Sequence, residues 1–237
     1  MKAILFDCDG VLVDTERDGH RVAFNRAFKA MGIDIEWDVP LYGGLLKTAG
    51  GKERMRRYFD KYGWPAGFDD RAVLIKELHD VKTGIFMEII AGGELPLRSG
   101  VSRLVDEAAA DGIKLAVCST SNERSVRMIV DKLLGGERGG KFSGIFAGDM
   151  VVRKKPDPSI YLLAKEKLGV DETECVVVED SRNGLLAAKA AGMRCVITKS
   201  AYTEMEDFTE ADYVVEELGD APAINMTLQD MRRLREV

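Results

Sequence analysis

The sequence predicts an α/β fold, with a parallel sheet flanked by helices and an inserted all-helical domain. Short apolar runs alternate with amphipathic stretches, a pattern typical of strands joined by helices. The predicted strands are residues 3–6, 114–118, 144–147, 175–178, 194–197 and 213–215. The first two strands are separated by about a hundred residues, far more than one crossover connection needs. This gap indicates an insertion after the first strand.

The insertion spans residues 16–92 and has mostly helical patterns, with predicted helices at 15–31, 52–62 and 71–90. Residues 1–15 and 93–237 would then form the other domain. The insertion contains 13 Lys and Arg against 12 Asp and Glu, whereas the remainder contains 21 against 28. The insertion is therefore nearly neutral, and the remainder carries the negative charge.

Composition excludes several classes of protein. The 46% hydrophobic content is ordinary for a globular core, and a net charge of −6 argues against a general nucleic-acid binder. No apolar run approaches the roughly 18 residues that span a bilayer, and residues 3–6 are too short a run for a signal peptide. We expect a soluble intracellular protein with no membrane or nucleic-acid partner.

The cysteines lie beside apolar runs without C-x-x-C spacing, which predicts buried, reduced thiols: Cys8, Cys118, Cys175 and Cys195.

Acidic side chains follow two of the predicted strands. Asp7 and Asp9 come directly after the first strand, and Gly10 permits a sharp turn there. Glu179 and Asp180 follow the fourth strand. Open α/β sheets bind ligands at the carboxyl ends of their strands, so we expect these acids at one edge. A D-x-D-G segment also occurs in ordinary turns, and the other strand ends must support this interpretation.

A hydroxyl and a lysine occupy further strand-end positions. Ser119 ends the second strand, and Thr120 and Asn122 follow it before a helix, where an N-cap is the alternative interpretation. Lys155 precedes a helix whose start Pro158 favours, although a lone surface lysine usually has no special role. With the acids, these residues supply a carboxylate nucleophile, a second acid, a hydroxyl, an ammonium group and a metal ligand. Those are the parts of a phosphoryl-transfer site.

The order and spacing of these four motifs resemble the haloacid dehalogenase superfamily over the whole chain. The resemblance implies a Rossmann-like catalytic core and a helical cap at residues 16–92. It further implies that Asp7 attacks phosphorus to form an aspartyl-phosphate, and that Asp9 protonates the leaving oxygen and then activates water.

The same resemblance implies a Mg²⁺ cofactor. Asp7 and Asp180 would bind it through their carboxylates and Asp9 through its backbone carbonyl, with Glu179 in reach of a metal-bound water. By resemblance again, Ser119 would hydrogen-bond the phosphoryl oxygens. Lys155 would neutralise charge on Asp7 and on the phosphate.

A basic cluster lies within the insertion. Residues 47–61 contain six Lys and Arg against two acids. A solvated helix face explains such a cluster, and so does an anion site, because Gly50, Gly51 and Lys52 form a predicted turn at a helix N-terminus. The segment is not a Walker A loop, since Glu53 stands where that loop has Ser or Thr.

The chain also resembles the CbbY-type phosphatases of photosynthetic organisms, which act on xylulose-1,5-bisphosphate, an inhibitory by-product of Rubisco. The residues that carry the resemblance are Asp14-Thr15-Glu16, Gly50 to Arg54, His79 with Lys82-Thr83, and residues 118–122 and 146–150. The resemblance implies a small-molecule phosphosugar substrate whose second phosphate binds Lys52 and Arg54. Glu16 and His79 would contact the sugar, and Gly50, Gly51, Thr120 and Asn122 complete the expected substrate-binding set. A single histidine such as His20 or His79 is more often structural, and helical spacing predicts that Arg56 and Arg57 face solvent.

Three alternatives stay open at this stage: a β-phosphoglucomutase-like phosphosugar mutase, a broad-specificity small-metabolite phosphatase, and a binding domain without catalysis. The complete set of acids disfavours the last, since a binder needs no nucleophile. No transit peptide precedes the first predicted strand, so a mature form in the chloroplast stroma and a cytoplasmic protein are both compatible with the sequence. Residues 227–237 predict an amphipathic helix, and the oligomeric state is open.

Overall fold

The chain folds into two compact units. The computed structural model describes residues 1–46, 48 and 51–234. Met1–Asp14 and Leu95–Val237 form one unit, called here the sheet unit, and Thr15–Glu94 form the other, the helical unit. The roles of these units as catalytic core and cap stay predictions.

The sheet unit contains a six-stranded parallel sheet in the order β3-β2-β1-β4-β5-β6. The strands are β1 (Ala3–Phe6), β2 (Lys114–Ser119), β3 (Phe142–Ala147), β4 (Cys175–Glu179), β5 (Arg194–Thr198) and β6 (Tyr213–Val215). The predicted fold class is thereby confirmed. In the register of the central strand, Phe6 lies opposite Val117 and Val178. The residues that follow these three strands therefore meet at one edge of the sheet.

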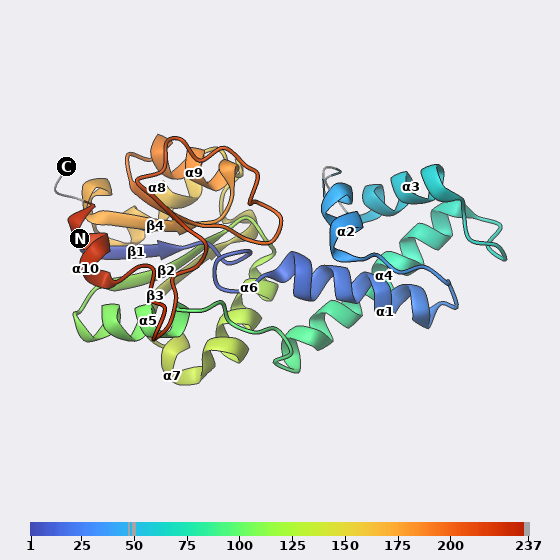
Figure 1. Ribbon diagram of the computed structural model, residues 1–237, viewed down its shortest axis with the longest axis horizontal. Coiled ribbons are helices and arrows are strands. Elements are labelled where there is room, and N and C mark those ends of the chain that lie inside the picture. The colour runs from blue at the N-terminus through green and yellow to red at the C-terminus, as the bar shows by residue number, and fades with distance from the viewer. Residues whose placement is uncertain (47, 49–50, 235–237) are drawn as a thin grey trace. The chain divides into compact units, whose positions relative to one another are not determined.

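Helices cover both faces of this sheet. They are α5 (Val101–Ala110), α6 (Glu123–Ile129), η2 (Val130–Leu134), α7 (Gly135–Gly139), η3 (Gly148–Met150), α8 (Ser159–Leu168), η4 (Glu172–Glu174), α9 (Arg182–Ala190) and α10 (Leu228–Arg233). Figure 1 shows α8 and α9 on one face, with α5 and α7 on the other. The expected helix at 227–237 spans Leu228–Arg233, and residues 235–237 lie outside the described part of the chain.

The core under α8 and α9 is built from alternate strand residues. Ala3 and Leu5 of β1 point to this face, as strand geometry requires, and pack with Tyr161 of α8 and Leu185 of α9. All four cysteines are buried and free, as the sequence predicts. The apolar residues of the strands thereby form a buried core beneath the sheet.

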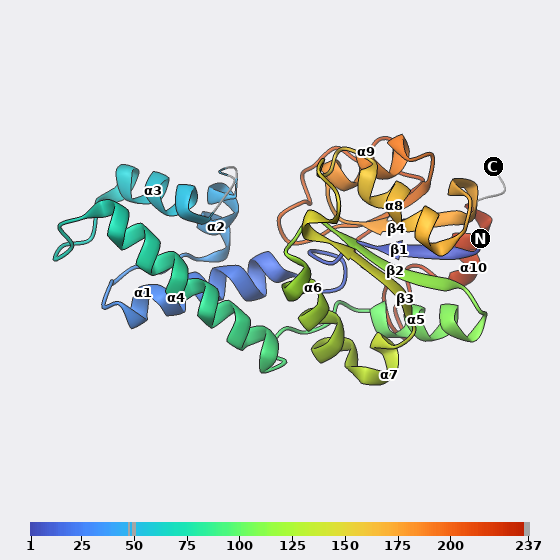
Figure 2. The same ribbon diagram turned by 180° about the vertical axis from the view of Figure 1, so that it is seen from behind.

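The helical unit contains η1 (Thr15–His20), α1 (Arg21–Ala30), α2 (Val39–Leu45), α3 (Gly51–Tyr62) and α4 (Arg71–Ala91). In Figure 2, α1 and α4 pack against each other and α3 lies beside α4. The sequence analysis did not predict α2, because its Val-Pro-Leu-Tyr-Gly-Gly-Leu sequence has a low helix propensity. That helix begins where Asp38 accepts a hydrogen bond from the backbone N–H of Leu41, with proline in its first turn.

An aromatic cluster forms the core of the helical unit. The rings of Phe24 and Phe28 lie 4.8 and 4.9 Å from that of Trp37, and Tyr42 and Phe59 extend the cluster. Packing of this kind holds α1, α2 and α3 together. Within the described residues, no helix has the length and apolar character needed to cross a membrane.

Candidate active site

The turn after β1 positions two of the predicted acids. The backbone N–H of Asp7 donates to the carbonyl oxygen of Val178 at 2.9 Å, which joins this turn to the end of β4. Gly10 has a φ of 82°, and a Cβ at this position would lie 1.9 Å from Oδ2 of Asp180. Only glycine fits both the backbone conformation and the close approach of Asp180. Gly10 therefore lets the two acidic strand ends come together.

Lys155 reaches the same place from the segment before α8. Its Nζ lies 2.6 Å from Oδ1 of Asp7 and 2.9 Å from the carbonyl oxygen of Cys118, and it also donates to Glu179. An ammonium group has three N–H donors, so these partners fix its orientation. The lysine side chain is 7% exposed, so its charge acts on Asp7 with little screening by water.

Three carboxylates form a group that fits a hard divalent cation. Asp7, Glu179 and Asp180 each offer an oxygen atom, and these atoms lie within 4.8 Å of one another. All three side chains are buried. Carboxylate oxygens are the ligands that Mg²⁺ and Ca²⁺ prefer, and a buried group of three acids beside one lysine is short of positive charge. The residues present therefore fit a bound divalent metal ion.

The ionisation of this group follows from its burial. Loss of hydration raises the pKa of Asp7 to about 8, against an opposing effect of Lys155. Burial and the charge of Glu179 raise the pKa of Asp180 well above its usual value. For Lys155, burial lowers the pKa, but Asp7 and Glu179 outweigh it and the net shift is upward. The lysine therefore stays charged, whereas the two aspartates need a further cation to ionise readily.

These shifts predict a pH-dependent stabilisation by metal. Without metal, folded Asp7 holds a proton that the unfolded chain releases near pH 4, so the contribution of Asp7 to stability falls as pH rises from about 4 to about 8. A divalent cation bound to these carboxylates would compete with that proton. We expect Mg²⁺ to raise the Tm more at pH 8 than at pH 5.5, by roughly 5–10 °C at a hundredfold excess over its Kd.

Thermal unfolding with and without Mg²⁺ at the two pH values measures this effect. In Asp180→Asn the shift should disappear, whereas the exposed Asp131→Asn should retain it. A shift of the same size at both pH values would contradict the assignment of the carboxylates as the metal site.

Two hydroxyl groups at the end of β2 contact Asp9, the second predicted acid of the turn after β1. Ser119 Oγ donates to Oδ2 of Asp9 at 3.3 Å, and Ser121 Oγ donates to the same oxygen at 2.5 Å. The backbone N–H of Ser121 donates to Ser119 Oγ at 3.0 Å. Ser121 was not among the predicted site residues, although it belongs to residues 118–122, which carry part of the family resemblance, and is the third consecutive hydroxyl residue after Ser119 and Thr120. Asp9 is therefore held at the end of β2.

Two other predicted residues lie close in sequence to this contact. Thr120 is exposed. Asn122 caps α6, where its side chain accepts a hydrogen bond from the backbone N–H of Arg124 at 3.0 Å. A cap of this kind is the alternative that the sequence left open for Asn122. Binding of substrate by Thr120 and Asn122 stays a prediction.

Arg98 was not predicted as part of the site. Its guanidinium donates to four backbone carbonyls, those of Gly10, Thr198, Lys199 and Glu216. It thereby ties the turn that carries Asp9 to the ends of β5 and β6. Nothing in the local sequence signals this role, because its partners lie some ninety to 120 residues away.

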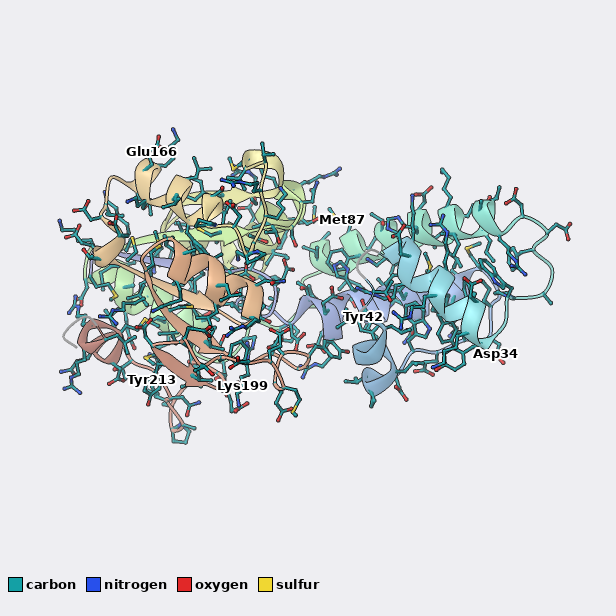
Figure 3. All side chains as sticks on the ribbon, turned by 90° about the horizontal axis from the view of Figure 1, so that it is seen from above. Asp34, Tyr42, Met87, Glu166, Lys199 and Tyr213 are labelled. Carbon is teal, nitrogen blue, oxygen red and sulfur yellow. The ribbon has the colours of Figure 1, made fainter. Side chains whose placement is uncertain are left out.

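The helical unit groups three of its polar side chains. The Tyr42 hydroxyl donates to Oε2 of Glu16 at 2.6 Å, and Nη1 of Arg54 donates to the Tyr42 oxygen at 2.6 Å. Arg54 lies 3.6 Å from Glu16 and is 8% exposed. Figure 3 shows Tyr42 among the side chains of this unit. Arg54 and Glu16 are therefore neighbours, joined by a tyrosine that the sequence analysis did not single out.

Two histidines and a lysine lie nearby in the same unit. Nζ of Lys82 lies 2.9 Å from Nδ1 of His20, and burial lowers the pKa of Lys82 to about 8. Burial, with Lys82 and Lys52, also lowers the pKa of His79. A Cβ at Gly51 would lie 3.3 Å from the His79 ring, so the start of α3 adjoins this histidine. Lys82 is therefore a buried basic residue that contacts His20 and lies close to His79, one of the predicted substrate-binding residues.

The basic residues of α3 differ from one another in exposure and direction. Arg56 and Arg57 are exposed, as helical spacing predicts, and Lys52 is half-buried. Arg54 is two residues from Lys52 and faces the buried Tyr42, so the two cations point in different directions. The predicted site residue Gly50 lies outside the described residues.

A buried carboxylate beside a lysine, at the carboxyl edge of a parallel sheet, provides a nucleophile and a positive charge that suit a reaction at a phosphoryl group. Residues 1–192 match the family model of haloacid dehalogenase-like hydrolases, and the chain belongs to this family. It is a phosphatase of the haloacid dehalogenase type. The family and enzyme class predicted from the sequence are confirmed.

Several of the similar proteins are CbbY or CbbY-like proteins. The chain is 59% identical over 224 residues to the CBBY-like protein of Arabidopsis thaliana, covering 93% of this chain and 70% of that protein. The crystal structure of CbbY from Rhodobacter sphaeroides in complex with phosphate is 40% identical, with a TM-score of 0.77 and coverage of 98% and 99% of the two chains. An aspartate-to-asparagine mutant of that CbbY, in complex with xylulose-(1,5)bisphosphate, is 42% identical, with a TM-score of 0.74 and coverage of 93% and 96%.

Proposed function

We propose that this phosphatase removes one phosphate from a sugar bisphosphate, with xylulose-1,5-bisphosphate as substrate and xylulose 5-phosphate and inorganic phosphate as products. The observation that carries the proposal is the likeness, at 42% identity over nearly the whole chain, to a CbbY structure that contains this bisphosphate. The basic cluster of the helical unit supports it, because a second phosphate needs cations of its own.

Asp7 is the proposed nucleophile. Its carboxylate oxygen forms a bond to phosphorus while the bond from phosphorus to the ester oxygen breaks, and Asp9 gives its proton to that leaving oxygen. Water then attacks the phosphorus of the aspartyl-phosphate, Asp9 takes the water's proton, and the Asp7 carboxylate and inorganic phosphate are released. Ser119 and Ser121 hold Asp9 at the end of β2, and β2 pairs with β1, the strand that Asp7 follows.

Lys155 and Ser119 are proposed to stabilise the charge that develops in these steps. Lys155 already donates to Asp7 at 2.6 Å, so it needs little rearrangement to follow the charge onto the phosphoryl oxygens. Mg²⁺, held by Asp7, Asp180 and the Asp9 carbonyl with Glu179 nearby, would supply Lewis acidity and neutralise the phosphate. Preorganised contributions of this kind typically lower the barrier by about 3 kcal/mol each.

The helical unit is proposed to bind the second phosphate. Lys52 stands in the first turn of α3, where free backbone N–H groups also favour an anion, and it is only half-buried. Lys82 adds a buried positive charge close to His79. Arg54 is the second proposed ligand of this phosphate. It also holds Glu16 through Tyr42, a contact that is proposed to present Glu16 to the sugar hydroxyls. His79 is the second proposed sugar contact.

A screen of phosphate release tests this function. Xylulose-1,5-bisphosphate, other sugar bisphosphates and sugar monophosphates are compared with and without Mg²⁺. We expect release of one equivalent of phosphate, dependent on Mg²⁺ and fastest for the bisphosphates. An isomeric sugar phosphate formed without net phosphate release would instead identify a mutase, and equal turnover of mono- and bisphosphates would indicate a broad-specificity hydrolase.

Removal of the Lys52 charge should separate the two classes of substrate. In Lys52→Ala, we expect kcat/KM to fall about tenfold for a sugar bisphosphate and less than twofold for a monophosphate, since a hydrogen bond to a charged group contributes about 1.5–3 kcal/mol. Steady-state kinetics on both substrates measure the effect. Arg56→Ala is the matched control, because Arg56 is exposed on the same helix and pairs with Glu53. Equal losses on both substrates would contradict binding of the second phosphate by Lys52.

A further inference from the structure

The carboxylate of Glu179 is held in one orientation by groups on both of its oxygens. Its Oε1 accepts hydrogen bonds from Lys155 and from the Tyr161 hydroxyl, the latter at 2.7 Å. Its Oε2 accepts from the backbone N–H of Asp180 at 3.0 Å and from Ser181. The side chain is completely buried. A carboxylate with donors on both oxygens and no contact with water has little freedom to turn.

The neighbouring backbone is shaped around the same carboxylate. A Cβ at Gly184, in the first turn of α9, would lie 1.9 Å from Cδ of Glu179. Glycine at this position therefore makes room for the carboxylate, and the serine that caps α9, Ser181, is one of its donors. The orientation of Glu179 is thus built by β4, α8 and α9 together.

The position of Glu179 affects the position of the Lys155 charge. The three donors of Lys155 are divided between Asp7, the carbonyl oxygen of Cys118 and Glu179. The ring of Tyr161 lies beneath the ammonium group, with its centroid 5.1 Å from Nζ. A change in the orientation of the Glu179 carboxylate would therefore change the position of the ammonium group relative to Asp7.

We propose that the Tyr161 hydroxyl is a positioning group for the phosphatase reaction, which acts through Glu179 to aim Lys155 at Asp7. Tyr161 touches Glu179 and lies under Lys155, and it is fully buried in α8. When the hydroxyl is present, Oε1 of Glu179 accepts hydrogen bonds from two donors, the neutral Tyr161 hydroxyl and the charged Lys155 ammonium group. Without it, Lys155 is the remaining donor to Oε1, and this charge-assisted bond strengthens at the expense of the bond to Asp7. The inference rests on the proposed nucleophilic role of Asp7.

Tyr161→Phe tests the hydroxyl alone, because phenylalanine keeps the ring that packs under Lys155. With p-nitrophenyl phosphate as substrate, we expect kcat to fall about tenfold while KM stays within twofold. The Ki of orthovanadate, which mimics the five-coordinate phosphorus, should rise by a similar factor. The Mg²⁺ concentration that gives half of the thermal shift should stay within twofold, since Asp7 and Asp180 are retained. Tyr213→Phe, at an exposed tyrosine of β6, is the matched control and should change none of these values.

A double-mutant cycle with Glu179→Gln tests whether the effect passes through Glu179. In the Glu179→Gln background, we expect Tyr161→Phe to change kcat less than threefold, because two groups of one network are not additive. A tenfold loss in both backgrounds would overturn the proposed route, and an unchanged kcat in Tyr161→Phe would overturn the proposal. Failure of Tyr161→Phe to fold, or a rise in KM alone, would assign the hydroxyl to structure or binding and would likewise overturn it.

The choice of substrate keeps this test separate from the proposed function. An enzyme that hydrolyses p-nitrophenyl phosphate but no sugar bisphosphate would contradict the proposed substrate and leave the Tyr161 measurements intact. Conversely, full activity of Tyr161→Phe beside rapid turnover of xylulose-1,5-bisphosphate would overturn only the positioning role.

Discussion

Replacing Asp7 by asparagine is expected to lower phosphate release by on the order of 10⁴-fold or more, because the amide cannot attack phosphorus to form the covalent intermediate. Asparagine has nearly the same shape as aspartate, and burial raises the pKa of Asp7 to about 8, so the metal-free fold does not require a charged group there. We therefore expect Asp7→Asn to fold as the native protein does. Steady-state phosphate release and the thermal unfolding curve measure the two effects.

The control for this change is Asp131→Asn, which removes an exposed aspartate of the same unit and should leave turnover unchanged. Trapping with rapid acid quench gives a second measurement, since native enzyme should retain labelled phosphate on the protein and Asp7→Asn should not. Normal phosphate release by Asp7→Asn would refute covalent catalysis at this residue.

Gly10→Ala is expected to have the second large effect, on both stability and metal binding. A residue with a side chain loses about 1–2 kcal/mol at a φ of 82°, and the added Cβ would collide with the Asp180 carboxylate 1.9 Å away. Because Asp180 is buried, it has little room to move aside. We expect a total loss of roughly 3 kcal/mol in the free energy of unfolding. We also expect the thermal shift by Mg²⁺ to disappear.

Gly112→Ala separates the two causes. Gly112 has a φ of 69° in the same unit, and a Cβ there would have no heavy atom within 4 Å. This variant should therefore show the backbone cost of about 1–2 kcal/mol without any change in the response to Mg²⁺. Denaturant unfolding and Mg²⁺ titration are measured for both variants. An equal loss in both, with metal binding intact, would show that the contact with Asp180 carries no energy.

The sheet and the meeting of its strand ends were predictable from the sequence. Buried parallel strands are short apolar runs, and their carboxyl ends share one edge, so Asp7, Lys155 and Asp180 were expected near one another. The structure brings these three residues together, and their chemical roles stay predictions. The prediction worked because Asp7 and Asp180 directly follow strands with a strong local pattern and Lys155 lies in the short segment before α8.

Contacts made by side chains across the fold could not be predicted in the same way. Tyr161 looks like an ordinary core residue of α8, because the sequence does not show that its hydroxyl meets a carboxylate. Arg98 looks like a linker residue, although four carbonyls from distant segments converge on it. Such roles depend on the packing of elements against each other, which has no local signature.

The basic cluster of the insertion shows that a count of charges along the sequence does not predict which basic residues are buried. A local charge count treats Lys52 and Arg54 alike, but each residue of a helix turns by about 100°, so two residues two positions apart face different sides. In the structure Arg54 is buried against Tyr42 and Lys52 is half-buried. Lys82, a cation that the count did not include, is buried by tertiary packing alone.

The two ends of the insertion are fastened to each other within the sheet unit. Val13 forms an antiparallel bridge with Leu97, and the backbone N–H of Arg98 donates to the carbonyl oxygen of Leu12 at 2.9 Å. The chain thus leaves and re-enters the sheet unit at adjoining points, which a short peptide can join. Exchange of the inserted segment between homologues, or its loss and replacement by a few residues, would leave the hydrogen bonds of the parallel sheet uninterrupted. Under the roles proposed for the two units, the segment that binds the sugar could therefore change in evolution without altering the residues proposed to break the phosphate ester.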